Sequence, residues 1–423
     1  MSPQPELQGV TRRRFLAAGA LGAGVLLCAP KLVRAGGTVR YCAMSPEMND
    51  LAGYTKAEDF SWTASEAVKT VTIPGVDTAY FKGYRTLLTI VDENGAQVRR
   101  AWVPGLLHAG CFGGNQVYLV TRGEGSAFYA LNLDTLEITA HALPEPGTLF
   151  GGHVIGWTQP GHFAVTVNRQ EQGAHDLVNI YEGKKLKRVD SFSSHGFQAH
   201  ELALAPDNKT LYVGHYGAYF MSGPYQHFRA EKLVQKLQSL TGNLTYFPGS
   251  VAAIGVGDHK LKQRLSDKRN GPQGHIAPGA DGSVYLTRFA PRLNSHEAVL
   301  NNPLFAAGAA DKSCPPEFYN TLEFKSSGTT VVFDNAAQQY LLAATHKGQV
   351  VYGSADQPDA MQAVEMTPHE YKKPYGLAFH PDGQHYVVSC DNGFALLQRK
   401  THEFVAERSF ALRLGLHSHM CAG

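Results

Sequence analysis

Short runs of alternating apolar and polar positions recur along most of the chain, and Gly, Asp and Asn separate them. Tyr and Val fill many of these positions, as is typical of strands with one buried face. Clear examples are 116–121, 163–167, 210–214, 283–287 and 385–389. Turns of the Pro-Asp-Gly kind precede several strands, at 206–208, 280–282 and 381–383. Because Pro fixes the first turn dihedral and Gly or Asn accepts positive φ, the pattern predicts strands joined by tight turns.

The spacing of the segments ahead of these turns predicts the architecture. These segments begin near His108, His153, His200, His275, Gly328, Tyr375 and His417, at intervals of 45, 47, 75, 53, 47 and 42 residues. A period of about 40 to 50 residues with four short strands per repeat is typical of a β-propeller. We therefore expect an all-β fold, a single β-propeller with seven blades. A pair of β-sandwiches is the alternative.

The long interval of 75 residues predicts an insertion near 222–273. Within it, residues 227–240 have a helix-forming composition with apolar residues at helical spacing, so the insertion is expected to be helical. A second irregular stretch, 291–324, is expected to be a long loop. The chain thus divides into residues 1–35, discussed next, and a propeller domain of residues 36–423.

Residues 1–35 have the organisation of an export signal. Thr11-Arg12-Arg13-Arg14-Phe15-Leu16 stands directly before an uncharged apolar stretch that ends in a small-residue cleavage pattern at Val33-Arg34-Ala35. The apolar stretch is short for a membrane span. A Ser/Thr-Arg-Arg-x-Phe-Leu motif is the signature of twin-arginine export, which predicts a periplasmic protein. An uncleaved N-terminal anchor is the alternative.

Composition excludes several other classes. Removing residues 1–35 leaves 33 basic against 35 acidic residues, so no excess positive charge indicates nucleic acid, and no second apolar run indicates a transmembrane segment. The remaining cysteines are scattered without Cys-x-x-Cys-His, which excludes a covalent c-type haem. Nucleophile-elbow, phosphate-loop and zinc-protease motifs are also absent from the sequence.

Four of the nineteen histidines occupy the same place in the repeat: His108, His153, His200 and His275. In a propeller, the residue that opens the innermost strand of a blade points toward the central channel. Neutral imidazole is a common ligand of copper, zinc and iron. We therefore expect a metal site at the axis, with Glu201 as a further ligand or as a partner that orients a histidine ring. Alternatively, each imidazole satisfies backbone groups between neighbouring blades.

The C-terminal run Leu416-His417-Ser418-His419-Met420-Cys421 is also rich in ligand atoms. His-x-His in a strand places both imidazoles on one face, so His417 and His419 are added to the candidate metal ligands. A tail whose ligands never converge, or the closing strand of the ring, is the alternative. The histidines His195, His215, His346, His380 and His385 are expected at the surface or in turns.

The segment between Phe150 and Gly217 resembles an uncharacterised family of twin-arginine-exported bacterial proteins, catalogued as domain of unknown function 1513. Phe150-Gly151-Gly152-His153 is similar to a Tyr-Gly-His-Gly step of that family, and Gln198-Ala199-His200-Glu201-Leu202 to its Pro-His-Glu-Leu run. The motif Gly214-His215-Tyr216-Gly217 and both long insertions depart from the pattern. Members are often encoded near imelysin-like and iron-uptake proteins, so the resemblance implies a propeller, export and a link with metal uptake.

These observations lead to three functional hypotheses. The first is a periplasmic propeller that binds a transition metal through the axial histidines, in metal acquisition or redox chemistry, with iron or copper as the expected ion and zinc also suitable. The second is a non-catalytic platform for a periplasmic or outer-membrane metal-uptake protein. The third is a propeller enzyme, an oxidoreductase or a lactonase-like protein, although lactonase-type propellers bind Ca²⁺ through carboxylates and amides where this chain has histidine.

Overall fold

The computed structural model consists almost entirely of β-strands. It describes residues 40–47, 68–92, 98–171, 174–220, 245–247, 250–266, 273–280, 284–290, 295–299, 328–344, 347–354, 356–366, 374–390, 393–409 and 419–422. The described residues contain no α-helix, and their longest helical element is the 3-10 turn η3 (Thr78–Phe81), capped by the Asp77 side chain. The export signal predicted at 1–35 lies outside the described residues.

Five antiparallel sheets have four strands each. They are β5 (Leu107–Gly113), β6 (Gln116–Thr121), β7 (Phe128–Asn132) and β8 (Ile138–Ala142); β9 (Thr148–Gly156), β10 (His162–Arg169), β11 (Leu177–Glu182) and β12 (Lys187–Ser193); β13 (Ala199–Leu204), β14 (Thr210–His215), β17 (Ser250–Gly255) and β18 (Leu261–Ser266); β22 (Gly328–Asp334), β23 (Gln339–Ala344), β24 (Gln349–Ser354) and β25 (Gln357–Glu365); and β26 (Gly376–Phe379), β27 (His385–Cys390), β28 (Gly393–Gln398) and β29 (Phe404–Ser409).

Three further sheets complete the molecule. A five-stranded sheet has the order β2 (Lys69–Thr70), β4 (Val98–Pro104), β3 (Arg85–Asp92), β1 (Arg40–Glu47) and β30 (His419–Ala422). A three-stranded sheet contains β19 (Gln273–Pro278), β20 (Val284–Ala290) and β21 (Ser295–Val299), and a hairpin pairs β15 (Ala218–Phe220) with β16 (Thr245–Phe247).

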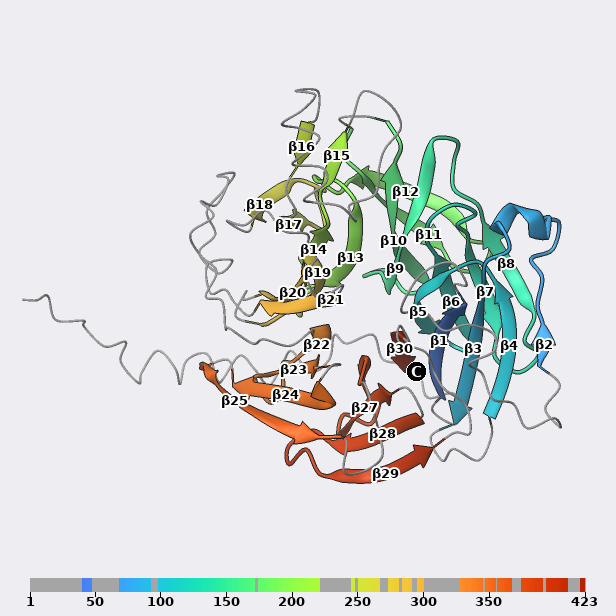
Figure 1. Ribbon diagram of the computed structural model, residues 1–423. Coiled ribbons are helices and arrows are strands. Elements are labelled where there is room, and N and C mark those ends of the chain that lie inside the picture. The colour runs from blue at the N-terminus through green and yellow to red at the C-terminus, as the bar shows by residue number, and fades with distance from the viewer. Residues whose placement is uncertain are drawn as a thin grey trace, which may run out of the picture.

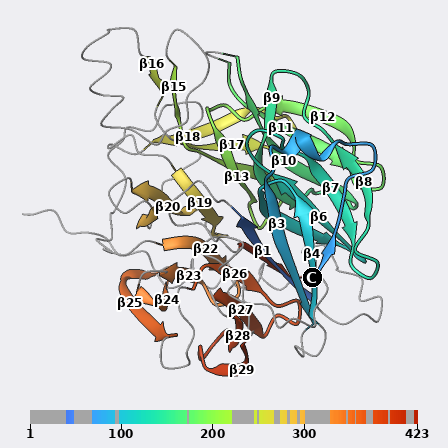
Figure 2. The ribbon, with the colours of Figure 1, turned by 45° about the vertical axis from the view of Figure 1, so that its right-hand side comes forward.

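The sheets surround a common axis, as in a β-propeller (Figure 1). The first strands β5, β9, β13, β19, β22 and β26 contact one another in chain order, and β30 contacts both β26 and β5. The ring is closed by the two ends of the described chain, because β1 and β30 are antiparallel neighbours in one sheet. Figure 2 shows from a second direction that the blue strand β1 lies next to the orange and red C-terminal blades. Pairing of the two ends joins the first and last parts of the ring in one sheet, so the ring does not remain open there.

The structure corrects two expectations about this ring. Six sheets have the four or more strands of a complete blade, not seven, and the sheet of β19, β20 and β21 has three strands in the described part of the chain. The expected helical insertion near 222–273 is also wrong where it is described, because β16, β17 and β18 fall within it. The segment 227–240 itself lies outside the described residues. The long loop expected at 291–324 contains strand β21.

Apolar side chains from adjacent sheets fill the space between blades. Between the second and third four-stranded sheets, for example, Ala164 and Ile180 pack against Leu202, Leu211 and Ile254, and all are buried. Tyr residues near strand starts are fully buried in several blades, among them Tyr129, Tyr340 and Tyr386. Central strands such as β6 and β14 are buried on both faces, with every residue after the first buried, because each sheet packs against a neighbour on either side. The packed blades form a rigid support for the side chains at the axis.

Candidate metal centre

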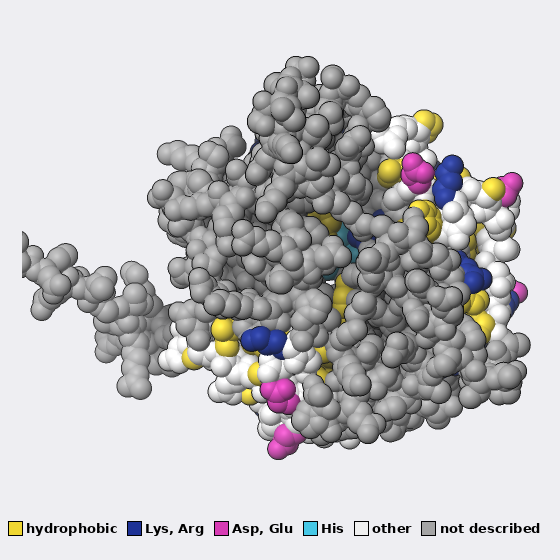
Figure 3. Space-filling view, in the orientation of Figure 1, with side chains coloured by type: hydrophobic (Ala, Val, Ile, Leu, Met, Phe, Trp, Pro, Cys, Tyr) yellow, Lys and Arg dark blue, Asp and Glu magenta, His cyan; other side chains and the backbone are white. Residues whose placement is uncertain are grey.

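The four predicted histidines all lie on the first strands of successive sheets, and all are buried. His108 is on β5, His153 on β9, His200 on β13 and His275 on β19. Their exposed fractions are 8, 6, 2 and 2 %. Figure 3 shows histidine side chains at the centre of this face of the molecule, next to Lys or Arg side chains. The centroids of the four rings lie 4.5 to 6.4 Å from one another, which confirms the expectation that the four histidines meet at one place.

Interruptions of the strand ladders place these side chains. In β5 the residues on either side of His108 pair with consecutive residues of β6, so His108 itself has no partner in the ladder. His200 in β13 is passed over in the same way. The ladders of β9 and β19 also shift register around His153 and His275. A β-bulge turns a side chain out of the regular alternation, and here it turns the histidines toward the axis.

Gly152 allows two of the histidines to approach closely. Its φ is +106°, a value that residues with a Cβ rarely adopt. A Cβ at this position would lie 3.1 Å from His108 Cδ2 and 3.2 Å from Arg122 Cβ. The glycine before His153 therefore leaves room for the His108 side chain beside the strand that carries His153.

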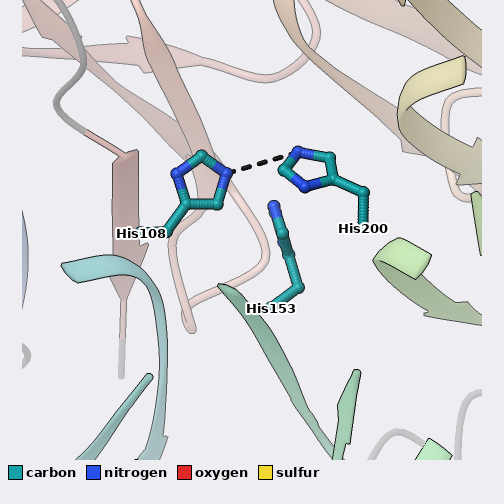
Figure 4. A group of neighbouring side chains, drawn as sticks. All are labelled: His108, His153 and His200. Carbon is teal, nitrogen blue, oxygen red and sulfur yellow. Dashed lines mark hydrogen bonds between the residues drawn. The ribbon is translucent and has the colours of Figure 1, made fainter. Parts of the chain in front are cut away.

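Three of the four imidazoles come together in one group. One ring nitrogen each of His108, His153 and His200 lies within 4.8 Å of the other two. The Nε2 atoms of His108 and His200 are 3.3 Å apart, and the distal nitrogen of His153 points toward the space beside them (Figure 4). Two nitrogens bound at about 2.05 Å to one tetrahedral ion are about 3.3–3.4 Å apart. The His108–His200 separation thus already matches the spacing that a metal ion requires.

His275 belongs to a second group, which includes Glu201. The Nδ1 atom of His275 is 3.0 Å from Glu201 Oε2, and His153 Nδ1 is 3.8 Å from Glu201 Oε1. Glu201 Oε2 also accepts a hydrogen bond from the backbone nitrogen of Ile276 at 2.7 Å. One ligand atom each of His153, Glu201 and His275 lies within 4.8 Å of the other two. The two groups share His153.

Hydrogen bonds between blades fix the backbone that carries the histidines. The hydroxyl of Thr166, on β10, accepts from His153 N at 3.4 Å and donates to His200 O at 3.2 Å. Tyr216 stacks on the His200 ring, with a centroid distance of 4.2 Å. Neither Thr166 nor its role was predicted, because a strand threonine has no distinguishing signal in a single sequence.

Asp176 is a second unpredicted residue that supports the site. Its carboxylate accepts hydrogen bonds from Ala199 N and Arg169 N, both at 2.7 Å, and from Asn168 Nδ2 at 3.0 Å. Burial raises the pKa of Asp176 to about 7, while these hydrogen bonds act in the opposite direction. Because Ala199 directly precedes His200, this carboxylate holds the start of the strand that delivers His200 to the axis.

The remaining candidates lie elsewhere or outside the described residues. His417 is not among the described residues, and of His419 only the backbone is described, where it pairs with Met44. The expected surface or turn position is wrong for His215, which is buried at the end of β14. His380 is buried as well, but it begins the turn between β26 and β27. His215 Nε2 is 3.1 Å from Ser194 Oγ, and burial lowers its pKa to about 3.

The structure also assembles a third group that the sequence pattern placed only in a turn. Asp382 Oδ2 lies 2.6 Å from His385 Nδ1 and 3.0 Å from His380 Nδ1. Asp382 N in turn donates to His380 Nδ1 at 3.1 Å. Two of these contacts are hydrogen bonds of the Pro-Asp-Gly turn between β26 and β27: His385 Nδ1 donates to Asp382 Oδ2, and His380 Nδ1 accepts from Asp382 N. These two hydrogen bonds stabilise the turn through the same atoms that would bind a metal.

The fold and site together define a β-propeller with a buried histidine cluster at its axis. A family model matches residues 108–421, and the chain belongs to that family, described as Protein of unknown function (DUF1513). The matched segment includes His108, His153, His200 and His275. No curated protein matches the chain. Among solved structures, a chain of hydrazine synthase from Kuenenia stuttgartiensis aligns with a TM-score of 0.49 and 10 % identity, covering 81 % of this chain and 100 % of that chain.

Within the described part of the chain, no helix is long and apolar enough to cross a membrane.

Proposed function

We propose that this protein binds a transition metal ion at the propeller axis through His108, His153 and His200. The observation that carries the proposal is the convergence of three buried imidazoles, one ring nitrogen of each within 4.8 Å of the others. Three adjacent imidazolium ions would repel one another in this low-dielectric setting, which favours the neutral form that binds metals. Imidazole suits iron, copper and zinc, and we propose iron or copper as the bound ion.

A site with three protein ligands favours metal transfer or catalysis over a purely structural role. Structural sites are usually closed by four protein ligands, whereas three ligands leave a position for water, substrate or another donor. This supports a role in metal acquisition or redox chemistry. If the protein takes up no metal, a non-catalytic platform for a metal-uptake partner becomes the better proposal.

Metal binding is tested with apoprotein titrated separately with Fe²⁺ under anaerobic conditions, Cu²⁺ and Zn²⁺, followed by calorimetry and elemental analysis. The double variant His108→Ala/His200→Ala should lose at least about 100-fold in affinity, because two of three ligands are gone. Thr330→Ala is a matched control, since Thr330 lies in the equivalent bulge of β22. Failure of all three ions to bind the wild-type protein above non-specific levels would contradict the proposal.

Binding should also weaken as the pH falls below about 6.5, because protons compete with the metal for neutral imidazole. Affinity measured at pH 7.5 and 5.5 should differ by at least about tenfold. An affinity that does not change between these values would exclude a histidine-based site.

We further propose that the protein acts in the periplasm, on the basis of Arg12 and Arg13 in the export motif. Changing both to Lys should leave unprocessed precursor in the cytoplasm, while the wild-type mature form should begin close to Gly36. Cell fractionation with N-terminal sequencing tests this. Normal export of the double variant would overturn the assignment of the signal.

A further inference from the structure

We infer that the axial site holds two metal ions, with His153 between them and the second ion bound by His153, Glu201 and His275. The inference rests on the proposed function, since the first ion is the one assigned above to His108, His153 and His200. What it adds is a second position with a different ligand set, which contains a carboxylate.

The geometry of the second position comes from Glu201. Its two carboxylate oxygens face two histidines, with Oε2 at 3.0 Å from His275 Nδ1 and Oε1 at 3.8 Å from His153 Nδ1. Two donors on one ion with bonds of about 2.1 Å are about 3.0–3.4 Å apart at angles between 90° and 109°. The His275–Glu201 distance already falls in this range. A small rotation of the His153 or Glu201 side chain brings the third donor into it.

His153 is suited to contact both ions because its two ring nitrogens face different groups. Nδ1 is the atom near Glu201, while the nitrogen at the far end of the ring points toward His108 and His200 (Figure 4). Two ions bound to opposite nitrogens of one imidazole are about 6 Å apart. This separation relieves much of the repulsion between two divalent cations, and each ion keeps three protein ligands.

The charges of the two ligand sets differ in a way that suits two ions. The first set contributes three neutral rings, whereas the second contains a carboxylate that is 18 % exposed. When both nitrogens of His153 bind metal, the ring gives up its N–H proton to solvent and becomes a bridging imidazolate with one negative charge. At His275 the proton moves from Nδ1 to Nε2 when Nδ1 becomes a ligand. Filling the second position therefore releases one proton.

A competing interpretation gives Glu201 only a positioning role. In that case its Oε2 accepts from His275 Nδ1 and from Ile276 N, and the carboxylate orients a ring without touching a metal. The two interpretations differ in stoichiometry. One predicts two ions per chain and the other predicts one.

The test is a Cu²⁺ titration of the full apoprotein, followed by elemental analysis and electron paramagnetic resonance. We expect two ions per wild-type chain and one in Glu201→Gln, whose amide oxygen still accepts from Ile276 N. Two Cu²⁺ ions joined by an imidazolate couple antiferromagnetically, so the fully loaded wild type should lose most of its signal. The variant should show the full signal of one isolated Cu²⁺.

The outcomes separate this inference from the proposed function. One ion in the wild type and an unchanged single ion in Glu201→Gln would overturn the inference and leave the proposed function intact. No bound Cu²⁺ in the wild type would overturn the inference, and the proposed function would fail with it only if Fe²⁺ and Zn²⁺ also did not bind. Two ions in Glu201→Gln would place the second ion elsewhere and also overturn the inference. His385→Ala is the matched control for the turn group of His380, Asp382 and His385, and it should leave the stoichiometry at two.

Discussion

The propeller contains two kinds of blade. The sheets that begin with β5, β9 and β13 each carry a histidine in an interruption of the first ladder, and the sheet that begins with β19 does the same. The sheet that begins with β26 has a regular first ladder from Gly376 to Phe379. The bulge of β22 contains Thr330 instead of a histidine. Both kinds have equally buried cores, so the blade architecture alone does not make the site. A site arises only where a bulge and a histidine coincide.

The largest difference between the two kinds of blade is expected in unfolding free energy. It should appear when the side chain that accepts a backbone hydrogen bond at the start of the first strand is removed. Asp176 holds Ala199 at the start of β13, and Ser389 Oγ accepts from Gly376 N at the start of β26. Asp176→Ala leaves several buried donors unsatisfied and should cost about 3–5 kcal/mol of unfolding free energy, whereas Ser389→Ala should cost about 1–2 kcal/mol. Urea unfolding measures both.

Metal affinity in the variants Asp176→Ala and Ser389→Ala shows whether Asp176 positions the metal site or only stabilises the fold. Metal affinity should fall at least about tenfold in Asp176→Ala, because His200 follows the anchored residue, and should not change in Ser389→Ala. Equal effects on affinity would mean that Asp176 acts only through general stability.

Acid sensitivity should also differ between the blades. Strand β14 ends with buried His215, and strand β27 ends with Cys390. Burial, with the nearby charge of Arg264, lowers the pKa of His215 to about 3. The unfolded chain takes up a proton there below pH 6.5 and the folded chain does not. Stability is therefore complete above about pH 6.5 and falls by about 1.4 kcal/mol per pH unit toward pH 3.

Comparing His215→Gln with the wild type isolates this contribution. Between pH 7 and 5 the wild type should lose about 2 kcal/mol more of its unfolding free energy than the variant does. The measurement is urea unfolding at both pH values. Parallel losses in the two proteins would show that His215 is not the group that titrates.

A smaller effect is expected from the glycine that lets blades approach at the axis. Gly152→Ala places a Cβ near His108 and Arg122 at a φ of +106°, which should cost about 1–2 kcal/mol and about tenfold in metal affinity. Gly147, just before the same strand, has a φ of +76° and open space around it. Gly147→Ala should cost a similar amount of stability without changing affinity, as measured by unfolding and metal titration. If metal affinity falls equally in both variants, the close approach at Gly152 makes no specific contribution to the metal site.

Local patterns predicted the strands and the position of the histidines well. The alternation at 116–121 corresponds to β6, and the runs at 210–214 and 385–389 fall in β14 and β27. The four histidines share one position in the repeat, which correctly predicted that they lie close together. The first strands of successive blades lie at the same distance from the axis, so their side chains can meet there. Recognition of the family from the segment around His200 is also confirmed.

Features that depend on contacts between residues distant in the sequence could not be predicted from local patterns. The strands β17 and β18 were assigned to a helical insertion, since spacing alone does not show which part of a long interval rejoins a sheet. The bulges depend on pairing register, and the contact between Glu201 and His275 joins two blades. The division of four histidines into two overlapping groups follows from these contacts and not from spacing.

The smallest expected effect concerns the hydroxyl that joins two histidine-bearing strands. Thr166 Oγ1 bonds to His153 N and His200 O, whereas Thr121 Oγ1 makes a comparable pair of bonds to Ala127 N and O. Both threonines are fully buried. Replacing either with Val keeps the shape and removes two hydrogen bonds, so each variant should lose about 1–2 kcal/mol of unfolding free energy.

Metal affinity should nevertheless distinguish the two variants. In Thr166→Val the strands β9 and β13 lose the bond that fixes His153 relative to His200, so affinity should fall about threefold to fivefold. In Thr121→Val the lost bonds connect residues that carry no ligand, so affinity should remain within measurement error. Calorimetric titration of both variants with the same ion measures the difference. If the affinities fall equally, the hydroxyl of Thr166 stabilises the blades and contributes nothing specific to the alignment of the two imidazoles.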